Sequence, residues 1–322
     1  MRFPPSSTLP DTRYNDSAKE RSLTPLVIMS LHDLFPQFVR QEIPLSMYTR
    51  LQLGGAAEFF AEPENEAELT ALIKRCRTDK MPMHVLGTGS SLLVPEAGVP
   101  GVVIILHKPE FCQVAVEGTL LTAGAGAQFG QVITQSVSQG LGGIEAFVGM
   151  PGSFGGAIRG NTGTIHGGDL GQWIESVRVV NIDGNVAVLS KNEITFGYRY
   201  SSLDDVVILS ATLRLEKDEP KELAKRMRKL WIIRKSQQPA GEAASVWAFK
   251  NPETGPSAGE LIEQVGLKGT RIGGAIVSDR NAGFITVESE CISDDVLRLI
   301  RLIQEQVVRQ TEVLLEPALE IW

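Results

Sequence analysis

The sequence lacks several features that mark particular classes of protein. Its longest apolar run, 102–106, is far shorter than the about 20 residues that span a membrane, so we expect no membrane insertion. Its three cysteines, Cys76, Cys112 and Cys291, are odd in number and far apart, which excludes a disulfide framework and is typical of a reducing cytoplasm. The net charge of −7 argues against nucleic acid as the main partner.

The four histidines also lack the spacing of a metal site, and we expect no metal. A content of 43% hydrophobic and 21% charged residues is that of a folded globular chain, and 322 residues correspond to two or more domains of about 150. Glycine is in excess, with 32 residues against a usual share of about 7%. Twelve of these glycines lie between Gly140 and Gly171, which predicts an unusual backbone there.

The first 28 residues differ from the rest of the chain. They are rich in Pro, Ser, Thr and charged residues, show no periodicity and contain no apolar core of a secretory signal. We predict a disordered tail over 1–28. Met29, just before the first ordered segment, is a candidate for the true start of the chain.

The first two predicted units mix helices and strands. In the first unit, 29–110, Asn65 caps a helix with Glu68 as its capping-box partner. Its strands are expected at 59–61, 83–86, 92–94 and 101–106. The second unit, 111–217, has one helix at 129–138 and strands at 113–116, 120–123, 177–181, 186–189 and 206–215.

The third predicted unit, 218–322, begins and ends with a helix. The first helix, over 222–234, carries an apolar stripe of Leu223, Met227, Leu230 and Trp231. The last helix is capped by Ser293 and Asp294, and its stripe is Val296, Leu297, Ile300, Ile303 and Val307. These patterns place two amphipathic helices around the third unit.

Two glycine-rich segments are candidate phosphate-binding loops. One is 87–91, which follows a strand, and the other is 149–157 with its continuation to 163. Glycine permits φ > 0 and close approach to the main chain, and clustered free N–H groups suit a phosphate or pyrophosphate. Neither segment is a Walker loop or a GxGxxG dinucleotide fingerprint. Each alone is more often a set of tight turns, and the presence of two such loops makes ligand binding as good an interpretation as turns.

Two basic segments leave their alternatives open. Arg199 lies between the aromatic residues Tyr198 and Tyr200, where its planar guanidinium suits a carboxylate or phosphate, or pairs with a surface acid. Arg234 and Lys235 lie at the end of a predicted helix, where the helix dipole favours positive charge in any case. They are therefore a solvated cap or a phosphate-binding arm.

Taken together, these segments resemble one family, the UDP-N-acetylenolpyruvoylglucosamine reductases, also called UDP-N-acetylmuramate dehydrogenases. The similarity runs from about Tyr48 to the C-terminus, and the order and spacing of its motifs are more specific than any single motif. The short link between Ser201 and Val206 is similar to the compact branch of the family, which lacks an extra substrate loop. The matching stretches are 51–55, 86–91, 149–157, 161–163, 196–201, 234–239, 249–252, 257–262, 266–269 and 272–275.

The resemblance implies an α+β fold, with a two-subdomain FAD-binding unit of the vanillyl-alcohol-oxidase type and a C-terminal α/β substrate domain. It implies FAD held without covalent attachment, in a cytoplasmic protein that is compatible with a monomer. The residues expected to hold this cofactor are Gly87, Thr88, Gly89, Ser90, Ser91, Gly149, Pro151, Gly152, Ser153, Gly155, Gly156, Asn161 and Gly163.

The implied reaction belongs to peptidoglycan precursor synthesis. NADPH reduces the flavin, which passes hydride to UDP-N-acetylglucosamine enolpyruvate, and the product is UDP-N-acetylmuramate. Arg199 matches the family arginine that polarises the substrate carboxylate and bears the developing enolate charge, and Tyr198 matches a substrate-contacting tyrosine. Lys250 and Asn251 match substrate-binding positions.

Two positions depart from the family. The ungapped register places Trp247 at the serine or cysteine that protonates the enolate, and Ser245 takes that role only after a local shift. Ala318 stands where the family has a glutamate, with Glu316 and Glu320 two residues to either side. Three hypotheses follow: a working reductase with Ser245 as displaced donor, a flavin-binding paralogue with impaired or lost activity, or a non-enzymatic nucleotide-sugar or flavin-binding protein.

Overall fold

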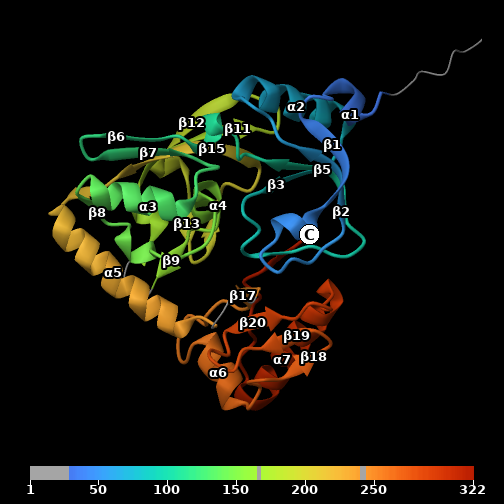
Figure 1. The fold of residues 1–322 in the computed structure, drawn as a ribbon, viewed down its shortest axis with the longest axis vertical. Helices are drawn as coiled ribbons and strands as arrows, with labels where there is room; N and C mark the ends of the chain where they lie inside the picture. Colours follow the sequence, from blue (N-terminus) through green and yellow to red (C-terminus); the bar gives the residue numbers. More distant parts are fainter. Residues whose placement is uncertain (1–28, 165–167, 240–243) are drawn as a thin grey trace, which may run out of the picture.

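The computed structural model describes residues 29–164, 168–239 and 244–322, so the predicted tail over 1–28 lies outside the described residues. Its first unit is a four-stranded sheet in the order β1-β2-β5-β3 with helix α2 (Glu66–Asp79) packed on it (Figure 1). The pairs β2–β5 and β3–β5 are parallel, and helix α2 provides the crossover from β2 to β3. The strands are β1 (Val39–Pro44), β2 (Ala56–Ala61), β3 (Met83–Leu86) and β5 (Val99–Ile105), preceded by the short helix α1 (Leu31–Leu34).

Helix α2 follows its predicted pattern. Its apolar stripe is buried, consisting of Leu69, Leu72, Ile73 and Cys76. Asn65 caps the helix by accepting a 3.0 Å hydrogen bond from the Glu68 backbone N–H. The reciprocal half of the expected capping box is wrong, because the Glu68 carboxylate accepts from the backbone N–H of Glu64 at 2.8 Å. Asn65 therefore caps the helix without a reciprocal bond from Glu68, whose side chain instead holds Glu64, the residue before the cap.

The second unit is a five-stranded antiparallel sheet in the order β12-β11-β15-β7-β6. Helices α3 (Phe129–Ser138) and α4 (Phe154–Arg159) pack on it around buried Phe129, Phe147 and Phe154. Val180, Val207 and Leu209 of this sheet belong to the apolar core of the first unit, which joins the two units. The strands are β6 (Val114–Glu117), β7 (Leu120–Gly124), β11 (Ile174–Asn181), β12 (Val186–Ser190) and β15 (Val206–Arg214).

The third unit is a four-stranded antiparallel sheet, β17-β20-β19-β18, with helices α6 (Ala258–Gln264) and α7 (Ser293–Thr311). The α7 stripe differs from the prediction at one position, because Leu299 is buried and Leu297 is half-buried. Ser293 is the first helical residue rather than the cap, and its hydroxyl donates to the Val94 carbonyl of the first unit at 2.5 Å. The strands are β17 (Ser245–Trp247), β18 (Arg271–Ile272), β19 (Ala275–Val277) and β20 (Phe284–Val287).

The long helix α5 (Pro220–Gln237) connects the second and third units (Figure 1). It packs against α3 and the 3-10 turn Glu145–Phe147 of the second unit, and the carbonyls of Ser236 and Gln237 at its end accept hydrogen bonds from two side chains of the third unit. Its expected stripe is only partly correct: Leu223 is buried and Met227 packs on the core, but Trp231 is exposed. The boundary at 218 remains a prediction, and the contacts of α5 favour a boundary after this helix.

The chain end returns to the first unit. Strand β21 (Glu320–Ile321) pairs in parallel with β4 (Leu92–Leu93), and Glu320 N–H donates to the Ser91 carbonyl at 2.9 Å. The Trp322 ring lies 4.8 Å from the His84 ring, centroid to centroid. Figure 1 accordingly marks the C-terminus beside the first unit.

Deleting residues 320–322 is expected to lower the free energy of unfolding by about 2–4 kcal/mol. The deletion removes two backbone hydrogen bonds, at about 1 kcal/mol each. It also removes the apolar contact of the Trp322 ring with buried side chains of the first unit, among them Leu86 and Leu92. Urea unfolding followed by circular dichroism measures this loss. The control is Ile321→Ala, because Ile321 is exposed and its truncation is expected to change stability by less than about 0.5 kcal/mol. Equal stability of deletion and wild type would show that this pairing does not stabilise the fold.

Within the described ranges, no helix is both long and apolar enough to cross a membrane. The same residues contain no cluster of three or more His, Cys, Asp or Glu side chains that could hold a metal ion.

Candidate functional site

The two glycine-rich segments face each other. Residues 87–91 follow β3 of the first unit, and Ser153 caps α4 of the second, its Oγ accepting from the Gly156 N–H at 3.3 Å. A Cβ placed on Gly87 would lie 2.4 Å from Ser153 Oγ, and one on Gly152 would lie 3.6 Å from Ser90 Oγ. The segments therefore lie against each other at the junction of the two units, and we treat them as the two walls of one candidate site.

The first segment, 87–91, offers unused hydrogen-bond donors. Among the described residues, no acceptor pairs with the backbone N–H groups of 88–91 or with the hydroxyls of Thr88, Ser90 and Ser91. Two of its carbonyls are used, since Gly89 accepts from Arg50 N–H and Ser91 from Glu320 N–H, both at 2.9 Å. A loop with fixed carbonyls and free N–H groups is suited to an anion such as a diphosphate.

The second segment contributes differently. The first N–H groups of α4 are already used within the protein: Phe154 donates to Ala127 and Gly155 to Ala125, each at 2.8 Å. Gly149 and Gly152 have φ of +77° and +138°, which glycine adopts readily. The glycines of this segment therefore leave room for a ligand to approach the backbone, whereas the first segment offers hydrogen-bond donors. Pro151 lies between these two glycines in the sequence.

Asn161 acts within the protein through its side chain. Its Nδ2 donates to the Gly197 carbonyl at 2.7 Å and its Oδ1 accepts from the Gly171 N–H at 2.8 Å, and the residue is buried. Gly163 is similarly enclosed, because a Cβ there would lie 2.0 Å from Asp169 Oδ1. Asn161 thus positions the hairpin that carries the next two candidate residues.

That hairpin consists of β13 (Phe196–Gly197) and β14 (Tyr200–Ser201), with Tyr198 and Arg199 as its two-residue turn. Arg199 has φ +56°, a left-handed conformation that costs a non-glycine residue about 1–2 kcal/mol. Tyr198 Oη accepts a 3.1 Å hydrogen bond from the Asn251 backbone N–H. The turn therefore extends from the second unit to the third.

Arg234 of α5 lies beside this turn and beside Gly149. Its guanidinium donates to the carbonyls of Ala146 and Phe147 at 3.1 and 3.4 Å, and a Cβ on Gly149 would lie 3.5 Å from Arg234 Cδ. Burial and then the positive charge of Arg199 lower the pKa of Arg234. Neither arginine forms an ion pair with an acid in the described chain. Two neighbouring uncompensated cations favour an anionic ligand.

The sequence alone could not decide whether Arg234 is a solvated helix cap or a ligand-binding residue, because a cation is favoured at the C-terminal end of any helix. Its inward direction follows from its position on the same face of α5 as buried Leu223 and half-buried Met227 and Leu230. That helical spacing is the signal that could have identified it.

The region expected to hold the proton donor lies on the sheet of the third unit. Ser245 and Trp247 are two positions apart on β17, so their side chains share one face of the sheet. Val246, between them, is buried on the other face. The Trp247 ring packs edge-on against Phe284 at 5.1 Å between centroids, and a Cβ on Gly283 would lie 2.6 Å from it. Trp247 is therefore packed in place by its neighbours.

The second departure is adjacent to the first. Ala318 N–H donates to the Ala248 carbonyl at 2.9 Å, so Ala318 lies beside the residue that follows Trp247. Glu316 is exposed and pairs with Lys250 (Nζ to Oε2, 3.4 Å), and the Glu320 carboxylate accepts from Trp322 Nε1 at 3.2 Å. The two positions at which we expect a departure from the family therefore lie close together in the third unit.

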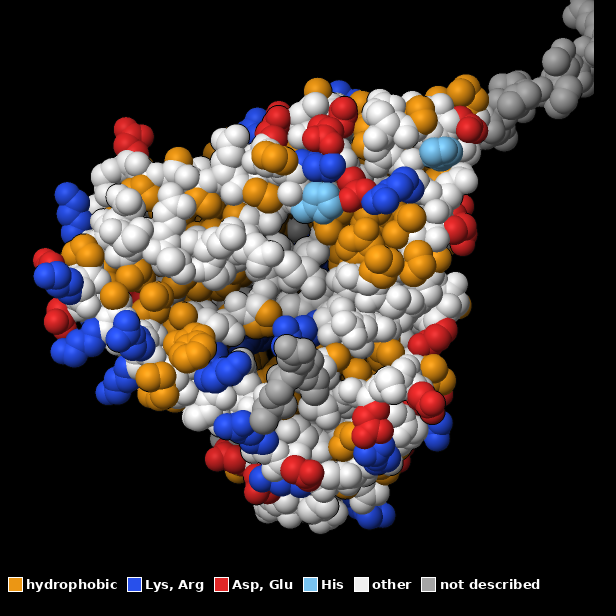
Figure 2. All heavy atoms as spheres, viewed as in Figure 1, with side chains coloured by type: hydrophobic (Ala, Val, Ile, Leu, Met, Phe, Trp, Pro, Cys, Tyr) orange, Lys and Arg blue, Asp and Glu red, His pale blue; other side chains and the backbone are white. Residues whose placement is uncertain are grey.

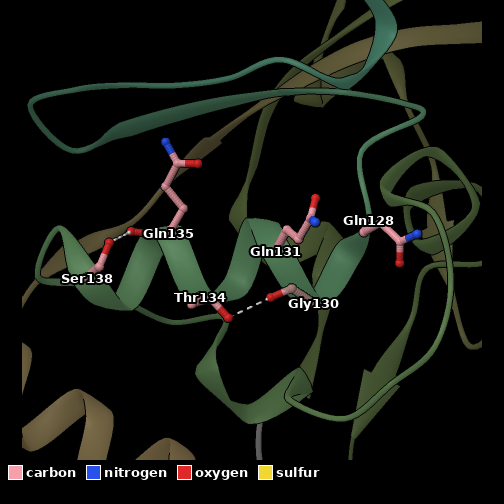
Figure 3. A pocket seen from close by; sticks show the side chains of 6 residues that line it. All are labelled: Gln128, Gly130, Gln131, Thr134, Gln135 and Ser138. Carbon is pink, nitrogen blue, oxygen red and sulfur yellow. Dashed lines mark hydrogen bonds between the residues drawn. The ribbon is translucent and has the colours of Figure 1, made fainter. Parts of the chain in front are cut away.

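A hollow of about 480 Å³ lies elsewhere, on the outer side of α3. Figure 3 shows its lining side chains, which include Gln131, Thr134 and Gln135 and no ionisable group. None of its lining residues belongs to the glycine segments. Figure 2 shows a separate recess between the second and third units, with Lys and Arg side chains at its rim.

Comparison with known proteins agrees with this arrangement. Residues 57–190 match an FAD binding domain, and residues 238–322 match the C-terminal domain of UDP-N-acetylenolpyruvoylglucosamine reductase. The facing loops with free N–H groups and bare glycines fit such a cofactor, so the protein is a flavoprotein, and the expected cofactor FAD is confirmed.

Relatives identify the family. The chain is 36% identical over 297 residues to the UDP-N-acetylenolpyruvoylglucosamine reductase of Rhodopirellula baltica, covering 91% of this chain and 97% of that protein. It is 39% identical over 280 residues to that of Moorella thermoacetica, covering 87% and 91%. The crystal structure of the Thermus caldophilus reductase superposes with a TM-score of 0.77 at 36% identity, covering 88% of this chain and 100% of that one.

The chain therefore belongs to the UDP-N-acetylenolpyruvoylglucosamine reductase family, and it is an oxidoreductase of that type. The predicted combination of an FAD-binding unit with a C-terminal domain of this family is confirmed.

Proposed function

We propose that this protein reduces UDP-N-acetylglucosamine enolpyruvate to UDP-N-acetylmuramate at the expense of NADPH, in the cytoplasm. The observation that carries the proposal is the meeting of three parts at one place: the glycine loops, the cationic pair Arg199 and Arg234, and the Tyr198–Asn251 contact. A flavin beside two cations suits an anionic, electron-accepting substrate.

Each wall has a proposed role. Bound FAD supplies hydride transfer, while the N–H groups of 88–91 hold its diphosphate and Gly149 and Gly152 leave room for it. Arg199 binds the substrate carboxylate and stabilises the charge that develops on it as hydride arrives. Tyr198, tied to Asn251, orients the substrate together with Lys250.

Proton delivery to carbon falls to Ser245 in this proposal. The indole N–H of Trp247 is far too weak an acid for this step, and Ser245 lies about 7 Å along β17 on the same face. The Ser245 hydroxyl has no partner among the described residues, which leaves it available to a substrate.

Ser245→Ala is expected to lower turnover by about 10²–10⁴-fold, the usual contribution of a general acid. Anaerobic stopped-flow absorbance separates the half-reactions: flavin bleaching by NADPH stays near wild type, and reoxidation by substrate slows. The control is Ser289→Ala, an exposed serine of the same unit. Unchanged turnover in Ser245→Ala eliminates the displaced donor.

The same experiment on the unaltered protein tests the function itself. Bleaching by NADPH followed by reoxidation with UDP-N-acetylglucosamine enolpyruvate supports the reductase. Bleaching without substrate-driven reoxidation favours the impaired paralogue. Protein purified without flavin, and unable to take it up, favours the non-enzymatic hypothesis.

A further inference from the structure

Helix α5 differs in charge from the rest of the chain. It contains seven Lys or Arg residues and one Glu, whereas the chain as a whole has a net charge of −7. The comparably long helix α7 has three Arg residues against three acidic ones. The excess on α5 is therefore local to this element.

Five of the seven positive charges of α5 lie on its outward face. Two of the seven cations are used inward: Arg226 pairs with Glu145 and Asp218 at 2.8 and 2.7 Å, and Arg234 faces the site. The other five are exposed, and only Lys225 has an acidic neighbour, Glu222 at 3.6 Å, within the described part of the chain. These outward cations are Lys221, Lys225, Arg228, Lys229 and Lys235.

Large apolar side chains lie among these cations. Trp231, Ile232 and Ile233 are 46%, 56% and 40% exposed. Ile232 is one helical turn from Arg228 and from Lys235, so it lies in the middle of the basic face. In Figure 2, hydrophobic side chains stand among Lys and Arg along the course that α5 follows in Figure 1.

We propose that this face of α5 docks onto a membrane surface rich in anionic phospholipid. Basic residues are drawn to the negative headgroups, and exposed Trp and Ile side chains insert at the boundary with the acyl chains. A second copy of the same face is a poor partner, because it would place like charges against each other. The inward ion pairs of Arg226 hold α5 in place beforehand, so docking needs no folding of the helix.

The test uses full-length protein and sedimentation with vesicles. We expect binding to vesicles of equal parts phosphatidylglycerol and phosphatidylcholine, decreasing as salt is raised, and no binding to phosphatidylcholine alone. The triple variant K221Q/R228Q/K229Q is expected to bind about 100-fold more weakly, at about fivefold per charge. The control is R301Q/R309Q, which removes two exposed cations from α7 and is expected to leave binding unchanged.

A second readout follows insertion. Tryptophan emission is expected to shift to shorter wavelength with anionic vesicles, and Trp231→Phe removes the shift while Ile232→Ser weakens binding at high salt. Equal binding to neutral vesicles, or unchanged binding of the triple variant, overturns the proposal. So does self-association that Ile232→Ser abolishes, which would make the face a contact between copies. Reductase activity is measured in parallel, so failure to dock is distinguishable from failure of the proposed function.

Discussion

Replacing Gly89 with alanine is expected to yield a folded protein that has lost its flavin. Gly89 has φ +59°, and its added Cβ would lie 2.3 Å from the Tyr48 carbonyl oxygen and 2.7 Å from Thr49 Cα. Both obstacles are backbone, so the loop must move and take the N–H groups of 88–91 with it. Two hydrogen bonds to a charged diphosphate, at about 1.5–3 kcal/mol each, correspond to at least about 100-fold in affinity. Flavin absorbance of the purified protein and FAD titration by fluorescence quenching measure the loss.

Gly118 provides the matched control. It has φ +63°, but a Cβ there meets nothing within 4 Å. Gly118→Ala therefore carries the same left-handed strain without the collision, and is expected to keep FAD at wild-type affinity. If Gly89→Ala also keeps its FAD, the donors of 88–91 do not hold the cofactor. Loss of flavin from both variants would instead identify backbone strain as the cause.

Arg199→Ala is expected to lower kcat by about 10²–10³-fold, the usual effect of removing one group that stabilises developing negative charge. The loss should fall on reoxidation of the flavin by substrate, measured by stopped-flow absorbance, and less on bleaching by NADPH. Arg199→Lys is expected to be intermediate, because lysine keeps the charge but not the planar pair of donors.

Arg214→Ala is the control for this variant, since Arg214 is a surface arginine of the same unit paired with Glu175 at 2.8 Å. It is expected to leave both half-reactions unchanged. Wild-type turnover in Arg199→Ala would contradict the assignment and leave Arg234 as the cation that faces the substrate.

Local patterns predicted most of the secondary structure. Helix α3 has the predicted bounds, 129–138, because its apolar spacing matches the face that it buries. The capping of α2 by Asn65 was also predictable, being a contact between residues three apart. Ser293 was misassigned as a cap because its partner, Val94, lies in another unit and leaves no local trace.

The sequence indicated the glycine-rich segments of the candidate site but not how their backbone groups are used. Clustered glycines indicate where a backbone must stay bare, but spacing does not reveal that 88–91 keep their N–H groups free while α4 uses its own. Asn161 was predicted to hold the cofactor, and the bonds of its side chain to Gly171 and to Gly197, in a hairpin distant in sequence, left no trace in the local pattern. Such distinctions need the tertiary arrangement.

The pairing of β21 with β4 restricts how the third unit can move. That unit is tethered on one side by α5 and on the other by its final strand, and Ser293 adds a third attachment. A large rotation of the third unit away from the site would have to break the pairing of β21 with β4, which directly follows residues 87–91. Ligands are therefore expected to exchange through a fixed aperture, and small-angle scattering profiles with and without substrate should coincide.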